Sequence, residues 1–196
     1  DISSAAFFMA ATILVPGSEL ILKNVGINPT RDGIIRVLKD MGANIEIINP
    51  TDEFEPVGDI KVSYSKLHAT TIGGDIIPTL IDELPLLAAM AALAEGTTVI
   101  KDAAELKVKE SNRIKVMCEE LSKLGVKAIE TKDGMEITGG SKIFGNITVN
   151  TYDDHRIAMT FAILNLVSDG EIKLDNKKCV EISYPEFFND LKKVNI

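Results

Sequence analysis

The 196-residue sequence has no tryptophan and few aromatic residues of any kind, 5% in all. Its two cysteines, Cys118 and Cys179, are too few for a disulfide framework or a cysteine-based zinc site, so a reducing compartment, the cytoplasm, is expected. No apolar run approaches the roughly 18 residues that a membrane-spanning helix needs, and no secretory signal is visible. We therefore expect an aliphatic core and no association with a membrane.

Positive charge is also scarce. The 21 lysine and arginine residues are outnumbered by 29 aspartate and glutamate residues, which gives a formal net charge of −8. Binding to nucleic acid is not expected, because it needs a basic stripe. Apolar residues make up 45% of the chain and charged residues 26%, which are the proportions of an ordinary folded domain.

The first residues are Asp-Ile-Ser-Ser, with no methionine, and the last ones form an amphipathic segment with a short tail. We expect this chain to be the C-terminal piece of a longer protein.

An internal repeat organises the sequence. Three segments begin with an aspartate, at positions 1, 82 and 154, continue through a mostly apolar helix, and stop near a glycine. Each is followed by a β-type run, at residues 19–22, 97–100 and 171–174. A second helix follows in each copy, at residues 31–42, 111–121 and 184–193. Short strands fill the gaps, among them residues 44–48, 60–62, 134–137 and 146–149.

The pattern predicts an α+β fold of three repeated βαβαββ-type units around buried parallel helices, because a helix that is apolar on all sides must be covered. The units lie near residues 1–60, 61–130 and 131–196, and together they form one domain over residues 1–196. The second helix of the middle unit has one apolar stripe, which includes Cys118 and places it in the core. Cys179 has no visible base partner.

Parallel helices would bring their amino termini to one face, where unpaired N–H groups and helix dipoles favour an anion. Polar residues gather at these starts and at the start of the second helix of the middle unit. Basic side chains there suit phosphate or carboxylate, and carboxylates beside a histidine suit proton transfer. The residues are Asp1, Ser3, Ser4, Asp82, Glu83, Lys107, Lys109, Glu110, Arg113, Asp153, Asp154, His155 and Arg156.

Each of these features has a purely structural alternative. An aspartate such as Asp82 or Asp154 can simply cap a helix, and Glu110 with Arg113 can form an ion pair on a solvated helix. A single histidine is more often structural than catalytic, and His68 is interpreted that way. The functional hypothesis depends on the coincidence that equivalent points of the repeat carry chemically different groups.

Two motifs carry a family resemblance. Residues 108–114 are Val-Lys-Glu-Ser-Asn-Arg-Ile, and residues 152–159 are Tyr-Asp-Asp-His-Arg-Ile-Ala-Met. In this order and at this spacing they resemble the enolpyruvyl transferases, specifically the 5-enolpyruvylshikimate-3-phosphate synthases. Shorter matches at residues 1–5, 28–33, 77–85 and 179–188 extend the resemblance from Asp1 to the end of the chain.

The resemblance implies one of two similar domains that close on their ligands. It implies transfer of the enolpyruvyl group of phosphoenolpyruvate to the 5-hydroxyl of shikimate 3-phosphate, by addition and elimination, with release of phosphate. The resemblance also implies that no metal or organic cofactor takes part. Members are longer than this chain, so the resemblance implies a missing N-terminal domain of the same protein as the partner, and the isolated chain is expected to be inactive.

By position, the resemblance assigns Asp82 to the shikimate hydroxyls and to proton acceptance. Lys109 would lie between the two substrates and assist proton transfer, and Glu110 would be the proton donor or relay near the enol methylene. Arg113 and Arg156 would hold phosphoenolpyruvate, and His155 would support that site.

Three positions depart from the family pattern. Asn112 replaces a common aspartate and is expected to cap the following helix equally well. Glu105 stands where some members have an asparagine that contacts the shikimate phosphate, and a carboxylate cannot take that role. Ile182 stands where some members have a phosphoenolpyruvate-binding lysine, for which Lys177 or Lys178 could substitute.

Two alternatives stay open from the sequence. A UDP-N-acetylglucosamine enolpyruvyl transferase would share the fold and the donor, although the two lead motifs favour the shikimate enzyme. A non-catalytic anion-binding domain could also be built on the same repeat.

Overall fold

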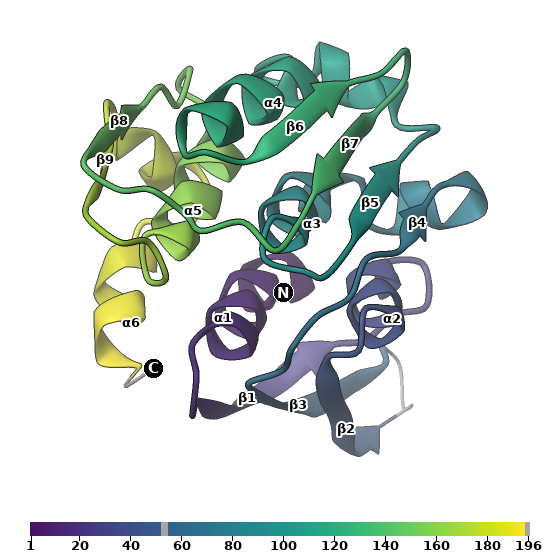
Figure 1. The fold of residues 1–196 in the computed structure, drawn as a ribbon. Coiled ribbons are helices and arrows are strands. Elements are labelled where there is room, and N and C mark those ends of the chain that lie inside the picture. The colour runs from purple at the N-terminus through teal and green to yellow at the C-terminus, as the bar shows by residue number, and fades with distance from the viewer. Residues whose placement is uncertain (52–54, 195–196) are drawn as a thin grey trace.

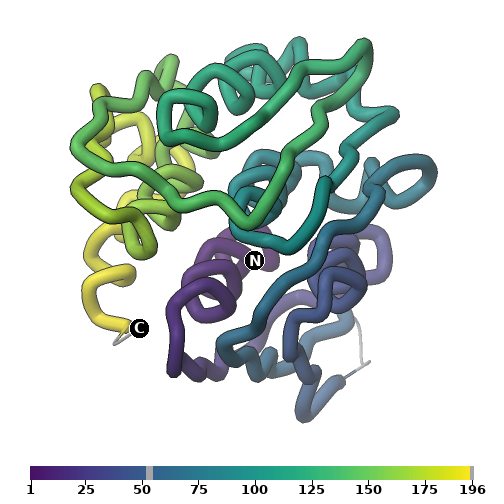
Figure 2. The backbone as a smooth tube through the Cα atoms, viewed as in Figure 1, coloured from purple at the N-terminus to yellow at the C-terminus, as the bar shows by residue number. Residues whose placement is uncertain are grey.

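The computed structural model describes residues 1–51 and 55–194 (Figures 1 and 2). Three central helices pack against one another, α1 (Ile2–Leu14), α3 (Leu84–Ala91) and α5 (His155–Leu164). Nearly every residue of α1 and α3 is buried, as the apolar sequence of both helices predicts. The longest described helix is α1, with 13 residues, and none in this part of the chain is long and apolar enough to cross a membrane.

The strands form three separate sheets around these helices. The first has the order β1-β3-β2 and is antiparallel, and the second has the order β4-β5-β7-β6, with β4 parallel to β5 and the other pairs antiparallel. A parallel pair, β8 and β9, forms the third. The bounds are β1 (Glu19–Gly26), β2 (Asn44–Thr51), β3 (Val57–Ser63), β4 (Thr71–Ile72), β5 (Thr97–Ile100), β6 (Lys127–Glu130), β7 (Met135–Thr138), β8 (Ile147–Val149) and β9 (Ile172–Leu174).

The repeat is visible in the order of the elements. The helix α3 leads to β5, α4 (Arg113–Lys123) and the hairpin β6–β7. The helix α1 leads in the same way to β1, α2 (Gly33–Asp40) and the pair β2–β3. In the third copy, α5 connects the paired parallel strands β8 and β9 along the chain, as α3 lies in the connection between the parallel strands β4 and β5. The predicted α+β fold of repeated units around buried helices is confirmed.

The outer helices are α2 (Gly33–Asp40), α4 (Arg113–Lys123) and α6 (Phe187–Lys193). All three begin two or three residues later than the sequence predicted. In α4 the reason is visible, because the Asn112 side chain caps the helix by accepting a hydrogen bond from the Lys115 N–H. The predicted apolar stripe of α4, which includes Cys118, is buried.

Short 3₁₀ segments account for the remaining differences from the predicted elements. They are η1 (Gly74–Thr79), η2 (Ile81–Glu83), η3 (Ala104–Val108) and η4 (Lys178–Ile182). The prediction that the middle apolar helix begins at Asp82 is wrong, since α3 begins at Leu84 and has Pro85 in its first turn. Asp82 therefore lies in a tight turn, where its side chain is free for other partners.

Candidate active site

The amino termini of the three central helices meet around one carboxylate. The hydroxyl of Ser3, at the start of α1, donates to Oε1 of Glu83, immediately before α3. The same Oε1 lies 3.5 Å from Nη1 of Arg156, in the first turn of α5. The helix starts therefore lie at one face, as the sequence predicted.

Beside this junction, Arg113 collects three carboxylates. Its Nε donates to Oδ2 of Asp154 at 2.9 Å, its Nη1 to Oδ1 of Asp82 at 3.2 Å, and its Nη2 to Oε2 of Glu110 at 2.7 Å. Nη2 also lies 3.3 Å from Oδ1 of Asp154. Only 1% of the Arg113 side chain is exposed, and these contacts engage four of its five N–H groups.

The position of Arg113 follows from the start of α4. Asn112 caps the helix, so Arg113 is its first residue and its side chain lies beside the starts of α3 and α5. Glu110, three residues earlier, forms with Arg113 the ion pair that the spacing predicted. This local pair is one part of a larger cluster, which includes Asp82 and Asp154 from distant parts of the chain.

Lys109 brings a second cation to Asp82. Its Nζ lies 3.8 Å from Oδ1 of Asp82 and 2.6 Å from Oε1 of Glu105. The alternative that Asp82 caps a helix is not seen, since α3 has no side-chain cap. Asp82 is partly exposed, so its carboxylate faces two cations and still has access to a ligand.

The carboxylate of Asp154 both caps α5 and binds Arg113. It caps α5 by accepting a hydrogen bond from the Arg156 N–H, and it also accepts from Arg113 and from the Ser111 hydroxyl. Burial alone would raise the pKa of Asp154, but the hydrogen bonds and charge of Arg113 outweigh burial and hold the pKa below its ordinary value. Burial lowers the pKa of Arg113, but the carboxylates of Asp154, Glu110 and Asp82 outweigh burial and raise it above its ordinary value. The pair is therefore ionised at neutral pH.

His155 follows directly after this aspartate and is half-buried. Burial lowers the pKa of His155, and the charge of Arg156 lowers it further, against the opposing effect of Asp154 and Glu110. The imidazole is therefore largely neutral at pH 7, and a neutral ring can both donate and accept a hydrogen bond.

Arg156 differs from Arg113 in how its donors are used. Within residues 1–51 and 55–194, its guanidinium has one hydrogen-bond partner, Glu83, so most of its N–H groups are available. A cavity of about 40 Å³ lies beside it, and its other polar lining residues are Asp1, Ser3, Ser4, Ser183 and Tyr184. Such a donor set can bind an anionic group.

The structure brings together most of the residues that the sequence placed at the site. Lys107 and Asp153 lie outside the cluster, because Lys107 pairs with Glu130 at 3.1 Å and Asp153 accepts a hydrogen bond from Asn176. Asp82, Lys109, Glu110 and Arg113 are joined by direct contacts, and Asp154 links them to the turn that contains His155 and Arg156. No group of three or more His, Cys, Asp or Glu side chains in the described part of the chain is arranged to hold a metal ion.

The sequence analysis did not predict three sets of contacts in the site. The i,i+4 spacing of Glu105 and Lys109 could have predicted their ion pair. Nothing in the sequence indicated that Asp154 binds Arg113, or that Glu83 binds Ser3 and Arg156, because these partners are 41 to 80 positions apart. Only the packing of the three central helices brings them into contact.

Lys177 or Lys178 could take the role of the lysine that some family members have at the position of Ile182, and this stays a prediction. Ile182 is highly exposed, and Nζ of Lys177 lies 5.8 Å from the centroid of the Phe188 ring.

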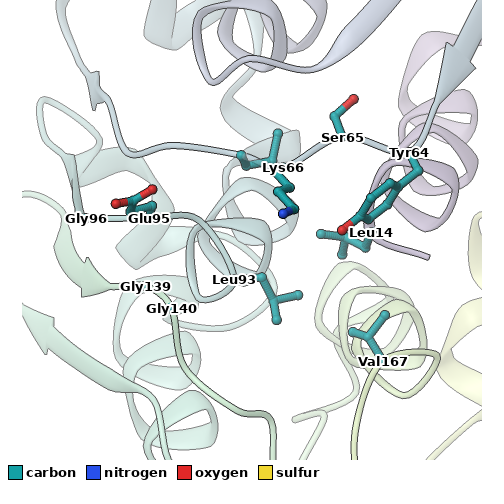
Figure 3. A pocket seen from close by; sticks show the side chains of 11 residues that line it. Leu14, Tyr64, Ser65, Lys66, Leu93, Glu95, Gly96, Gly139, Gly140 and Val167 are labelled. Carbon is teal, nitrogen blue, oxygen red and sulfur yellow. The ribbon is translucent and has the colours of Figure 1, made fainter. Parts of the chain in front are cut away.

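A larger cavity, of about 390 Å³, lies at the opposite ends of the central helices. Figure 3 shows Leu14, the last residue of α1, together with Leu93 and Val167, which follow the ends of α3 and α5, and with Tyr64 and Lys66. None of the predicted site residues is among those that line it. The predicted chemistry is therefore confined to the face where the helices begin.

The model of one protein family, EPSP synthase (3-phosphoshikimate 1-carboxyvinyltransferase), matches residues 1–191. The chain belongs to the EPSP synthase family. This membership confirms the resemblance found in the two lead motifs, and it favours the shikimate branch over the nucleotide-sugar alternative.

Relatives within the EPSP synthase family match the whole chain. A 3-phosphoshikimate 1-carboxyvinyltransferase of Bacillus cytotoxicus is 54% identical over 192 residues, which are 97% of this chain and 45% of the relative. The protein of the same name from Bacillus subtilis is 51% identical over 196 residues, which are 100% of this chain and 46% of the relative. The chain thus spans about half the length of these relatives.

Solved structures agree with this assignment. EPSP synthase from Acinetobacter baumannii, solved at 2.37 Å, superposes with a TM-score of 0.94 at 41% identity, over 98% of this chain and 45% of that structure. The enolpyruvyl transferase NikO from Streptomyces tendae superposes with a TM-score of 0.78 at 18% identity, over 98% of this chain and 42% of that one. The second likeness shows that the two chains share a fold.

Proposed function

We propose that this chain supplies one side of an active site that transfers the enolpyruvyl group of phosphoenolpyruvate to the 5-hydroxyl of shikimate 3-phosphate. The other side would come from the part of the protein that corresponds to the unmatched half of the relatives. The observation that supports this proposal is the cluster in which Asp82, Lys109, Glu110 and Arg113 are in direct contact, beside an arginine with free donors.

The reaction needs a base for the attacking hydroxyl and an acid for the enol methylene. Asp82 takes the hydroxyl proton as the oxygen forms a bond to C2 of phosphoenolpyruvate. Glu110 delivers a proton to C3 in the same addition, which leaves a tetrahedral intermediate. Elimination then breaks the bond between C2 and the phosphate oxygen as a proton returns from C3 to Glu110. Asp82 passes the hydroxyl proton to the departing phosphate, so both carboxyl groups return to their starting states.

The cations of the cluster hold the Asp82 and Glu110 carboxylates in position. Lys109 and Arg113 both contact Oδ1 of Asp82, and Arg113 also holds Glu110. The resemblance assigns both Arg113 and Arg156 to the binding of phosphoenolpyruvate. Since Arg113 already binds three carboxylates, we propose that it mainly orients Asp82 and Glu110. It would contact phosphoenolpyruvate by releasing one of these carboxylates and binding the ligand in its place.

Arg156 and His155 complete the donor side of the site. We assign Arg156 to the anionic groups of phosphoenolpyruvate, because most of its N–H groups are available in the described structure. His155, largely neutral at pH 7, can donate a hydrogen bond to the same ligand without adding charge.

The proposal is tested by rebuilding a complete enzyme. The chain is fused to the N-terminal portion of the Bacillus subtilis relative, of which it matches the remaining 46%. We expect the fusion protein to release phosphate only when phosphoenolpyruvate and shikimate 3-phosphate are both present, and the 196-residue chain alone to release none.

Two outcomes would contradict the proposal. A well-folded fusion protein that binds phosphoenolpyruvate without turnover would favour a non-catalytic anion-binding domain. Phosphate release that depends on UDP-N-acetylglucosamine, and not on shikimate 3-phosphate, would assign a different acceptor.

A further inference from the structure

Glu83 is a buried carboxylate with no role in the mechanism above. Only 1% of its side chain is exposed. Oε1 accepts from the Ser3 hydroxyl and lies 3.5 Å from Arg156, whereas Oε2 is buried and has no hydrogen-bond partner among the described residues. Burying a carboxylate with an unsatisfied oxygen is unfavourable, so packing alone does not account for a glutamate at this position.

The surroundings of Arg156 give Glu83 a purpose. Arg156 lies in the first turn of α5, and the contacts of Glu83 bring it beside the starts of α1 and α3. Each helix start carries partial positive charge, so these dipoles disfavour a guanidinium there. Glu83 supplies the one carboxylate that contacts this guanidinium in the described structure, and it binds a single nitrogen, Nη1.

A second arginine holds the carboxylate in place. Nη2 of Arg31 donates to Oγ of Ser3 at 3.1 Å, and the Ser3 hydroxyl donates to Glu83. The chain of contacts from Arg31 through Ser3 and Glu83 to Arg156 crosses all three helix starts. It fixes one end of the Arg156 guanidinium and leaves its other N–H groups free.

We propose that Glu83 is a positioning residue, which holds the Arg156 guanidinium against the dipoles of three helices so that its free donors meet the anionic donor substrate. The inference rests on the proposed function, in which Arg156 binds phosphoenolpyruvate. Glu83 itself does not touch a reacting atom, so its removal should affect the binding of phosphoenolpyruvate more than the rate of the chemical step.

The kinetic test uses the fusion protein described above. In Glu83→Ala we expect the KM for phosphoenolpyruvate to rise about tenfold, with kcat within about threefold of the original value. Glu83→Gln keeps an acceptor oxygen for Ser3 and Arg156 but loses the charge, so the KM should rise by about three- to fivefold, less than in Glu83→Ala. The KM for shikimate 3-phosphate should not change in either variant.

Three results would overturn the proposal. The KM for phosphoenolpyruvate could stay within twofold in Glu83→Ala, kcat could fall while the KM stays constant, or Glu83→Gln could be as impaired as Glu83→Ala. If Glu83→Ala does not fold, Glu83→Asp applies the same test, because it keeps the charge but withdraws it from Nη1. The KM is then expected to rise several-fold.

A double-mutant cycle tests whether Glu83 acts through Arg156. In an Arg156→Ala background, adding Glu83→Ala should change the KM for phosphoenolpyruvate less than twofold. A second tenfold increase would show that Glu83 acts independently, and would overturn the proposal.

A final measurement needs no activity, and so separates this inference from the proposed function. In the 196-residue chain with ¹⁵N-labelled arginine, the Nε–Hε signal of Arg156 is assigned from its loss in Arg156→Lys. We expect this signal to report a rigid Arg156 side chain in the original protein and in Glu83→Gln. In Glu83→Ala we expect it to report a side chain that moves among several orientations. A side chain that is already averaged in the original protein would contradict the inference, even if the fusion protein is active.

Discussion

Arg113 and Asp154 form an ion pair in which 1% of one side chain and none of the other is exposed, with 2.9 Å between Nε and Oδ2. The pair joins the first residue of α4 to the cap of α5. Because Arg113 also holds Asp82 and Glu110, the geometry of both proposed proton-transfer groups depends on this buried contact.

Removing the charge of Asp154 should destabilise the fold. Asp154→Asn leaves Arg113 buried without its main partner, and breaking such a pair costs about 3–5 kcal/mol. Urea unfolding followed by circular dichroism measures this loss. The matched control is Glu119→Gln on α4, where an exposed pair with Lys115 at 3.8 Å should contribute less than about 1 kcal/mol. Equal losses in the two variants would mean that burial adds nothing to the Arg113–Asp154 pair.

Asp82→Asn should separate activity from stability. Asp82 is partly exposed, so the loss of its charge should change the free energy of unfolding by less than about 1 kcal/mol. Loss of a proton acceptor should lower kcat of the fusion protein by about 10²–10⁴-fold. Phosphate release measures kcat, with the exposed Asp75→Asn as the control. Near-normal turnover in Asp82→Asn would remove this residue from the proposed mechanism.

His155 should make the fold less stable as the pH falls. Its pKa is lowered in the folded chain by burial and by Arg156, so the unfolded chain binds this proton first as the pH drops through about 6.5. The free energy of unfolding, measured in urea at pH 7.5 and 5.5, should therefore decrease. His155→Asn should show a smaller decrease, and an unchanged pH dependence would argue against the lowered pKa.

Neither thiol should react readily in the folded protein. Burial raises the pKa of Cys118 to about 11, with help from Glu130 and Glu119, and burial also raises the pKa of Cys179. At pH 8 about one Cys118 in a thousand would be ionised, and only the thiolate attacks a disulfide reagent. Ellman's reagent should detect almost no thiol in native protein and two per chain in urea. Rapid release from native protein would show that one cysteine is accessible.

The elements of the fold could be predicted well because their signals are local. Apolar segments such as residues 1–11 are buried helices since no polar face is available, and the glycines that end them are visible in the sequence. Boundaries were less predictable: Asp82 looked like a helix start, but Pro85 and the 3₁₀ turn η2 move the start of α3 to Leu84.

The composition of the site could also be predicted, but its contacts could not. The motif that contains Lys109, Glu110 and Arg113 gives one local ion pair from its spacing alone. It does not indicate that Arg113 turns inward to Asp154, 41 positions away, or that it is almost completely buried.

The amino-acid sequence by itself determined which helices are buried, because a helix without a polar face has no stable place at the surface. It also determined the family, through two motifs whose order and spacing are specific. Only the tertiary structure decided which charges meet. Partners from different repeats become neighbours when the three helices pack, and a buried charge is stable only when its partners lie within hydrogen-bonding distance.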